Sequence, residues 1–182
     1  MPRVTPVSDK SQVAAEHQSI ADEVIKVFGG LRGPHSILML RPPLDQKVLA
    51  VGNHFRYDAL VKPQEGELAI ITAARERDCG YVWAAHVNAG RRAGVREEAI
   101  TAVREKKAPA GLTPDEAAIV TYVQQLFRTN RVEQAAFDAL KNKYGVEWLV
   151  ELTTLAGYYG MLAGVVNAFE VQAAPEGDKL PV

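Results

Sequence analysis

The chain has 182 residues, of which 47% are apolar and 24% charged, and its formal net charge at pH 7 is -1. This ordinary globular balance excludes a disordered or fibrous chain, and the length suits one domain. A net charge near zero gives no bulk electrostatic reason to bind nucleic acid or an anionic membrane. The single cysteine, Cys79, excludes an intramolecular disulfide and is typical of a reducing compartment, so we expect a cytoplasmic protein.

Apolar residues recur at three- and four-residue steps along almost the whole sequence, which predicts helices throughout. Proline and glycine residues mark where most of these helices begin and end. The expected helices cover about residues 8–28, 34–40, 44–60, 79–93, 96–106, 132–143 and 146–171, and two more open at Pro63 and Thr113.

Two helix boundaries carry clear signals. The run from Thr113 to Glu116 places a capping Thr before a proline at the first helical position, with Glu three residues after the cap. Asp78 is a good N-cap for the helix that follows it, and Gly94 is the expected glycine at the C-terminal end of that helix.

No segment makes a convincing strand, and no repeat or linker interrupts the body of the chain. The sequence therefore predicts an all-α fold, a single-domain helical bundle of about eight helices over residues 1–172. Residues 173–182 hold Pro, Gly and charges, so we expect a mobile C-terminal tail. The most apolar stretch, 148–171, is interrupted by Glu151 and Glu170, which favours a buried helix over a membrane span.

The densest run of polar and aromatic residues lies between Glu76 and His86. Cys79 and His86 are seven residues apart, nearly two helical turns, so a helix would place both on one face. If Asp78 caps this helix, Cys79 lies in its first turn, where free N–H groups and the helix dipole favour the thiolate, against the adjacent carboxylate. An acidic Cys79 is therefore one hypothesis from the spacing.

Glu67 lies twelve residues before Cys79, on the preceding expected helix. Two antiparallel helices could bring its carboxylate to the face that holds Cys79 and His86. Such a set could relay a proton, with Glu67 orienting His86 and His86 exchanging protons with a thiol or a substrate. The alternatives are structural: a lone cysteine is most often a small buried apolar residue, and a lone histidine on a half-apolar helix is often structural.

Aromatic residues near this set are candidate substrate contacts, namely Tyr81, Trp83 and Tyr159, although aromatic residues at helical spacing more often belong to the core. The other histidines, His17, His35 and His54, are scattered and lack the spacing of metal ligands, so no metal site is expected. No glycine-rich run follows a strand as a phosphate-binding loop would, and no cofactor is expected.

The same residues resemble the carboxymuconolactone decarboxylase family, which includes the alkylhydroperoxidase D-like proteins. The resemblance covers roughly residues 44–171 and implies the alkylhydroperoxidase D-like helical fold and a homo-oligomer, commonly a trimer or hexamer. The matching parts are residues 65–70, 75–86, 89, 93–95, 100 and 149–171.

One position departs from the pattern of the alkylhydroperoxidase D-like members. These use a Cys-x-x-Cys pair, a His four residues after the second Cys and a Glu twelve residues before the first. Glu67, Cys79 and His86 match three of these places, but Val82 stands at the second cysteine. Because Val82 cannot form a disulfide, a peroxidase of this kind would need an external thiol and an altered role for Cys79.

Three functions remain open. The leading one is a cofactor-free, carboxymuconolactone decarboxylase-like lyase that acts on a small carboxylate or lactone by proton transfer. In it His86 is the general acid/base, Glu67 is its partner, and Cys79 assists or lines the pocket. The second is a thiol-dependent peroxidase that uses Cys79 alone, and the third is a non-catalytic oligomeric binding or scaffold protein. A cationic side chain that would hold substrate carboxylates cannot be chosen from the sequence.

Overall fold

The structure is a computed structural model that describes residues 2–106 and 111–181. The described residues form nine α-helices and two short 3-10 helices and contain no strand, which confirms the all-α prediction. In chain order the elements are η1 (Lys10–Gln12), η2 (Ala15–His17), α1 (Gln18–Phe28), α2 (Pro34–Leu38), α3 (Pro42–Tyr57), α4 (Pro63–Glu76), α5 (Gly80–Ala93), α6 (Glu97–Arg104), α7 (Pro114–Thr129), α8 (Gln134–Tyr144) and α9 (Val146–Ala168).

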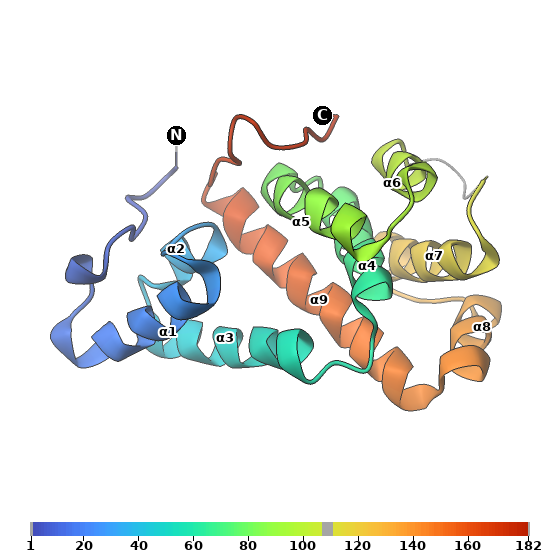
Figure 1. The fold of residues 1–182 in the computed structure, drawn as a ribbon, viewed down its shortest axis with the longest axis horizontal. Helices are drawn as coiled ribbons and strands as arrows, with labels where there is room; N and C mark the ends of the chain where they lie inside the picture. The colour runs from blue at the N-terminus through green and yellow to red at the C-terminus, as the bar shows by residue number, and fades with distance from the viewer. Residues whose placement is uncertain (1, 107–110, 182) are drawn as a thin grey trace.

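Helix α9 runs diagonally through the middle of the molecule, with α1–α3 on one side and α4–α8 on the other (Figure 1). The mean hydropathy and length of α9 are those of a membrane-crossing helix, but half of its most apolar window is buried inside the protein. It packs against α2, α3, α4, α5 and α8. Its apolar character is therefore accounted for by its central place in the fold.

Two hydrophobic cores lie on the two sides of α9. The larger one is built from α4, α5, α7 and α9 around residues such as Ile71 and Leu152, both without exposed surface. The smaller one is built from the N-terminal segments around Val24 and Leu49. A third cluster joins α2 and α3 to the second half of α9, where Tyr158 is the largest member. The two sides of the molecule thus meet along α9.

The predicted boundary signals act as expected at three helices. Thr113 caps α7: its hydroxyl accepts a hydrogen bond from the Glu116 N–H (3.3 Å), and the Glu116 carboxylate accepts one from the Thr113 N–H (2.8 Å). Gly94 ends α5 and Gly29 ends α1, both in the left-handed conformation that glycine adopts most readily.

The single helix expected over residues 8–28 is wrong in its first half. The α-helix begins only at Gln18, and the residues before it form the short turns η1 and η2. The Asp9 side chain accepts a hydrogen bond from the Ser11 N–H, and the Gln12 side chain accepts one from the Asp9 N–H, which closes a separate turn. Val13 is then extended and buried in the N-terminal core, which breaks the helical path.

The expected capping role of Asp78 is also wrong. Cys79 is the N-cap of α5, and Asp78 has a left-handed φ of 45°. The Asp78 carboxylate bonds instead to Arg75, in the last turn of α4, and pairs with Lys106 at 3.2 Å. The Asp78 carboxylate therefore pairs with two cations, Arg75 and Lys106, instead of capping the N-terminus of α5.

The segment after α9 lies against α5 and α6 rather than apart from the body. The Asp178 carboxylate accepts hydrogen bonds from the Trp83 indole (3.2 Å), Arg104 (2.6 Å) and Arg91 (3.2 Å). These contacts hold the tail against α5 and α6. The mobility of the tail stays a prediction.

Candidate active site

Glu67 and His86 meet between α4 and α5, an arrangement that the sequence left open. The two helices are antiparallel neighbours: the Gln64 side chain donates to the Gly94 carbonyl at one end (2.7 Å), and the Cys79 N–H donates to the Ala74 carbonyl at the other (2.8 Å). Between these ends, His86 Nδ1 lies 2.9 Å from Glu67 Oε2. The packing of α4 against α5 therefore brings together two residues that are 19 positions apart in the sequence.

The environment of His86 leaves one ring nitrogen available. The side chains of His86 and Glu67 are 21% and 19% exposed, so both are partly buried but reachable. The Tyr159 ring stands edge-on to the imidazole, with the ring centres 4.7 Å apart. Because Nδ1 faces the Glu67 carboxylate, it carries the hydrogen of that bond, and Nε2 is the atom that can exchange a proton.

His86 stands between two cavities. The first cavity has a volume of about 330 Å³ and is lined by α5, by α9 and by the N-terminal segments. The second has a volume of about 450 Å³ and lies on the Glu67 side of the pair. Four residues line both cavities: Gly52, Arg56, His86 and Tyr159. The first cavity is of the size that takes a small molecule.

Cys79 is a core residue and not part of the cavity walls. Its side chain has no exposed surface, belongs to the large core and lines neither cavity. Burial raises the pKa of the thiol, although the N–H groups of Val82 and Tyr81 in the first turn of α5 act in the opposite direction. The acidic thiol that the helix N-terminus suggested is therefore wrong, because desolvation outweighs the backbone N–H groups.

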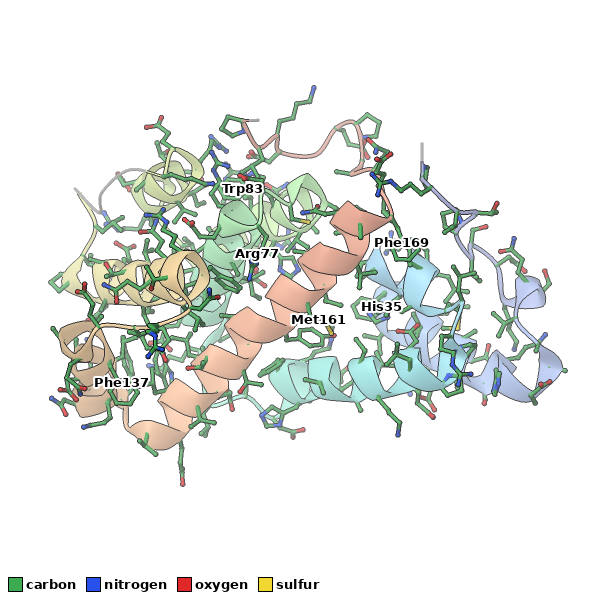
Figure 2. The ribbon with its side chains drawn as sticks, turned by 180° about the vertical axis from the view of Figure 1, so that it is seen from behind. His35, Arg77, Trp83, Phe137, Met161 and Phe169 are labelled. Atoms are coloured by element: carbon green, nitrogen blue, oxygen red, sulfur yellow. The ribbon has the colours of Figure 1, made fainter. Side chains whose placement is uncertain are left out.

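The three aromatic candidates separate into two groups. Tyr81 and Tyr159 line the first cavity. Trp83 has no exposed surface, lines no cavity described here and donates its indole N–H to Asp178. Figure 2 places Trp83 on the α5 side of α9 and His35 on the other side, among the N-terminal helices. Trp83 is therefore positioned as a core residue.

The cavity tyrosines keep their protons at neutral pH. Burial raises the pKa of Tyr158 to about 12, with the Asp45 charge adding to the shift. Burial raises the pKa of Tyr159 further still, with the Glu67 charge adding to it, and burial also raises the pKa of Tyr81. All three hydroxyls are therefore hydrogen-bond donors at the cavity wall.

The N-terminal wall of the first cavity holds residues that no sequence pattern pointed to. Arg32 and Arg56 both line it, are exposed and have no carboxylate partner among the described residues. The Arg56 guanidinium lies over the Phe28 ring at 4.9 Å. These are the cationic side chains that the sequence could not single out, because nothing in the spacing of residues 28–56 relates them to His86.

The histidines that looked scattered occupy defined places. His35 lines the first cavity, and its Nδ1 lies 2.6 Å from Asp45 Oδ1. His54 lies on the far side of α3, with Nε2 3.2 Å from the Glu151 carboxylate. Within residues 2–106 and 111–181, no three His, Cys, Asp or Glu side chains gather as metal ligands would.

Comparisons with known proteins agree with this fold. Residues 42–125, a little under half of the chain, match the family described as carboxymuconolactone decarboxylase, which confirms the resemblance. An uncharacterised peroxidase-related protein from Ralstonia eutropha, described as an alkylhydroperoxidase AhpD core, has a TM-score of 0.76 at 16% identity over 95% of each chain. No curated protein sequence matches the chain.

A second solved structure has the same architecture. This protein of unknown function from Agrobacterium tumefaciens, described as a candidate antioxidant defence protein AhpD, has a TM-score of 0.69 at 20% identity. The match covers 76% of this chain and 96% of that one. At such identities the two likenesses establish the fold and carry no activity with them.

Proposed function

We propose, for a chain whose residues 42–125 belong to the carboxymuconolactone decarboxylase family, that the protein is an enzyme that moves protons on a small carboxylate or lactone. The observation that carries the proposal is that His86, which lines the first cavity, pairs with Glu67. A histidine that is oriented by a carboxylate and open at its second nitrogen is suited to general acid/base catalysis near neutral pH.

In the proposed reaction, the bond between a substrate carboxylate carbon and the neighbouring ring carbon breaks, and carbon dioxide leaves. The electron pair of that bond passes into the unsaturated lactone, which becomes a delocalised anion. The Nε2 proton of the His86 imidazolium then moves to a carbon of this anion and gives the enol-lactone, and water returns a proton to His86. The Glu67 carboxylate holds the ring in place and stabilises its protonated form.

The remaining wall residues fit a substrate that carries negative charge. Arg32 and Arg56 present guanidinium groups without a carboxylate partner among the described residues, and such groups bind carboxylates well. The hydroxyls of Tyr158 and Tyr159 stay protonated and can donate to an oxygen on which charge develops. Binding and anion stabilisation would thus come from two helices, α3 and α9, and from the segment between α1 and α2.

The peroxidase alternative depends on a thiolate that meets peroxide. Cys79 is fully buried, its thiol pKa is raised, and Val82 replaces the second cysteine. What favours this alternative is the description of the Ralstonia protein as peroxidase-related, which is a statement about that protein. The geometry favours proton transfer over thiol chemistry.

Decarboxylation of carboxymuconolactone by purified wild-type protein and by a His86→Ala variant tests the proposal. We expect the variant to lose about 100-fold or more in turnover. His54→Ala is the matched control, because His54 also pairs with a carboxylate but lines neither of the two cavities. Full activity in His86→Ala, or no release of carbon dioxide from this or related unsaturated carboxylates by the wild type, would overturn the proposal.

The homo-oligomer that the resemblance implies is a further part of the proposal. Large apolar side chains are exposed on α3 and the start of α9, among them Val51, Val146 and Val150. Contiguous apolar surface of this kind is typical of contacts between subunits. Sedimentation at micromolar concentration is the test, and a monomer would count against the assembly.

A further inference from the structure

A second histidine–carboxylate pair faces the first cavity. His35, on α2, places its Nδ1 2.6 Å from Oδ1 of Asp45, on α3. The two side chains are 3% and 0% exposed. His35 is nevertheless part of the cavity wall, and the Phe28 ring, whose centre lies 4.5 Å from that of the imidazole, covers it on one side.

The hydrogen bonding of this pair resembles that of Glu67 and His86. In each pair the carboxylate faces Nδ1, and a bond of this length holds one hydrogen atom between the two heavy atoms. Nε2 of His35 is then the ring nitrogen left for the cavity. Both histidines therefore line the first cavity from two different helices, and in both Nε2 is the ring nitrogen without a carboxylate partner in the described part of the chain.

Within the part of the chain that the structure describes, one oxygen of the Asp45 carboxylate has no hydrogen-bond partner, which is unusual for a carboxylate with a purely structural role. Its Oδ2 atom is buried and accepts no hydrogen bond from the described residues. Buried polar oxygens nearly always have a partner, and an incompletely paired buried charge destabilises a fold. The groups that face the pair from other elements are the Tyr158 hydroxyl on α9 and the guanidinium groups of Arg32 and Arg56. A stability role alone leaves the Asp45 arrangement unexplained.

We infer that His35 is a second proton-transfer residue of the first cavity and that Asp45 is its positioning residue. This inference rests on the proposed function, in which the cavity binds a small carboxylate. One histidine takes a proton from one atom of the bound molecule, and the other delivers a proton to a different atom of the same molecule. Each then exchanges its proton with water, so no proton is gained or lost in a full cycle.

This arrangement defines the substrate more closely. A pair of proton-transfer groups on two walls suits an unsaturated carboxylate that loses a proton at one end of a conjugated system and gains one at the other. Decarboxylation followed by protonation needs only His86. The second pair therefore favours a reaction that includes a shift of a double bond within the same molecule.

The first test uses the unaltered protein and benzoate as the probe. Nitrogen-15 NMR of the histidine rings reports which ring nitrogen carries a hydrogen and whether the probe changes its surroundings. We expect saturable benzoate-dependent shifts at Nε2 of both His35 and His86, and none at His54, which lines neither cavity. A response at His86 without one at His35 would overturn the inference and leave the proposed function intact.

The second test separates chemistry from folding with His35→Asn. The asparagine amide can still donate to Asp45 from the place of Nδ1, but the variant lacks Nε2. For the double-bond shift of an unsaturated carboxylate, we expect kcat to fall about 100-fold, with KM and Tm little changed, while decarboxylation, which needs only His86, keeps its rate. His54→Asn is the matched control. Wild-type kcat of His35→Asn for the double-bond shift, or a loss confined to Tm and KM, would show a structural role and overturn the inference.

Asp45→Asn tests the positioning residue. The asparagine amide can donate to Nδ1, so the ring hydrogen of His35 should move to Nε2, which the same NMR signal detects. We expect kcat to fall with this change of tautomer, which loss of packing alone would not produce. If neither histidine responds to benzoate and His86→Ala is fully active, the proposed function itself fails.

Discussion

The two walls of the first cavity differ in how they hold their polar groups. On the C-terminal wall, His86 is held on a helix of the large core, and it and its partner Glu67, which lines the second cavity, are each about one-fifth exposed. On the N-terminal wall, His35 and its partner Asp45 are almost fully buried. Reactive groups benefit from rigid elements and solvent access, so under the proposed function we expect the main proton transfer at the C-terminal wall.

The guanidinium groups show the opposite distribution. Arg32 and Arg56 both belong to the N-terminal wall, where they are exposed and have no carboxylate partner among the described residues. Each wall rests on its own hydrophobic core, and α9 joins the two. The first cavity therefore lies between two packed units. Under the proposed function, one unit would supply the main acid/base group and the other the positive charge.

The largest expected loss of activity comes from a substitution behind the C-terminal wall. Glu67→Ala removes the carboxylate that orients the His86 ring. We expect kcat to fall about 100-fold while benzoate binding changes little, because the arginines are untouched. Steady-state kinetics and calorimetric titration measure the two quantities. Weaker benzoate binding with an unchanged kcat would reverse the assignment of roles.

A smaller effect tests the N-terminal wall. Arg56→Gln removes one of the two exposed guanidinium groups, so we expect the Kd for benzoate to rise about tenfold. Arg128→Gln is the matched control, because Arg128 pairs with Glu76 on the surface of α7 and lines neither cavity. Equal Kd values for wild type and Arg56→Gln would remove the binding role from this wall.

The features that could be predicted from the sequence are those set by segments close together in the chain. Glu67 and His86 lie on consecutive helices, so a tight antiparallel pair was enough to bring them together. The cap at Thr113 and the glycine at Gly94 are likewise set by a few adjacent residues. The place of His35 in the wall of the same cavity as His86 could not be predicted, because it depends on how the N-terminal core packs on α9.

Two failures near Cys79 have local physical causes. The spacing argument treated Cys79 as helical, but it is the N-cap, with φ -95° and ψ 92°, so helical periodicity does not apply to it. Asp78 does not cap α5 because its carboxylate pairs with Arg75 and Lys106. Lys106 lies just after the end of α6. Competition among several polar partners is decided by tertiary structure, which a single sequence does not contain.

The contact between the two walls can be tested at Gly52 on α3. A Cβ atom there would lie 2.5 Å from the Tyr158 hydroxyl and 3.2 Å from Cζ, so Gly52→Ala must push Tyr158 aside. Alanine is favoured over glycine within a helix by about 1 kcal/mol. We expect the clash to exceed this gain, so that Gly52→Ala lowers the free energy of unfolding by about 1 kcal/mol.

The same substitution in a Tyr158→Phe background is the matched control. Without the hydroxyl, the nearest atom to the new Cβ is Cζ, and the helix preference should then make Gly52→Ala neutral or stabilising. Urea unfolding of the four proteins gives the coupling between the two positions. Equal effects of Gly52→Ala in both backgrounds would show that the walls are not in tight contact here.

The smallest expected effect on activity belongs to Cys79. Because burial raises its pKa, the thiol is protonated in the folded protein at neutral pH, and iodoacetamide should react with it far more slowly than with free cysteine. Because the pKa is higher in the folded state, the buried neutral thiol stabilises the fold fully at pH values below the pKa of the unfolded thiol. It is lost as the pH rises through the higher pKa of the folded state.

Cys79→Ala separates the thiol from the histidine site. We expect its kcat to stay within about twofold of the wild type, because the thiol lines neither cavity and general acid/base catalysis does not need it. Alkylation rates between pH 6 and 10 and the kinetics of the variant are the measurements. Rapid alkylation at pH 7, or a loss of kcat as large as that of Glu67→Ala, would return Cys79 to the reacting groups. The C-terminal wall would then hold a thiol site rather than a histidine site alone.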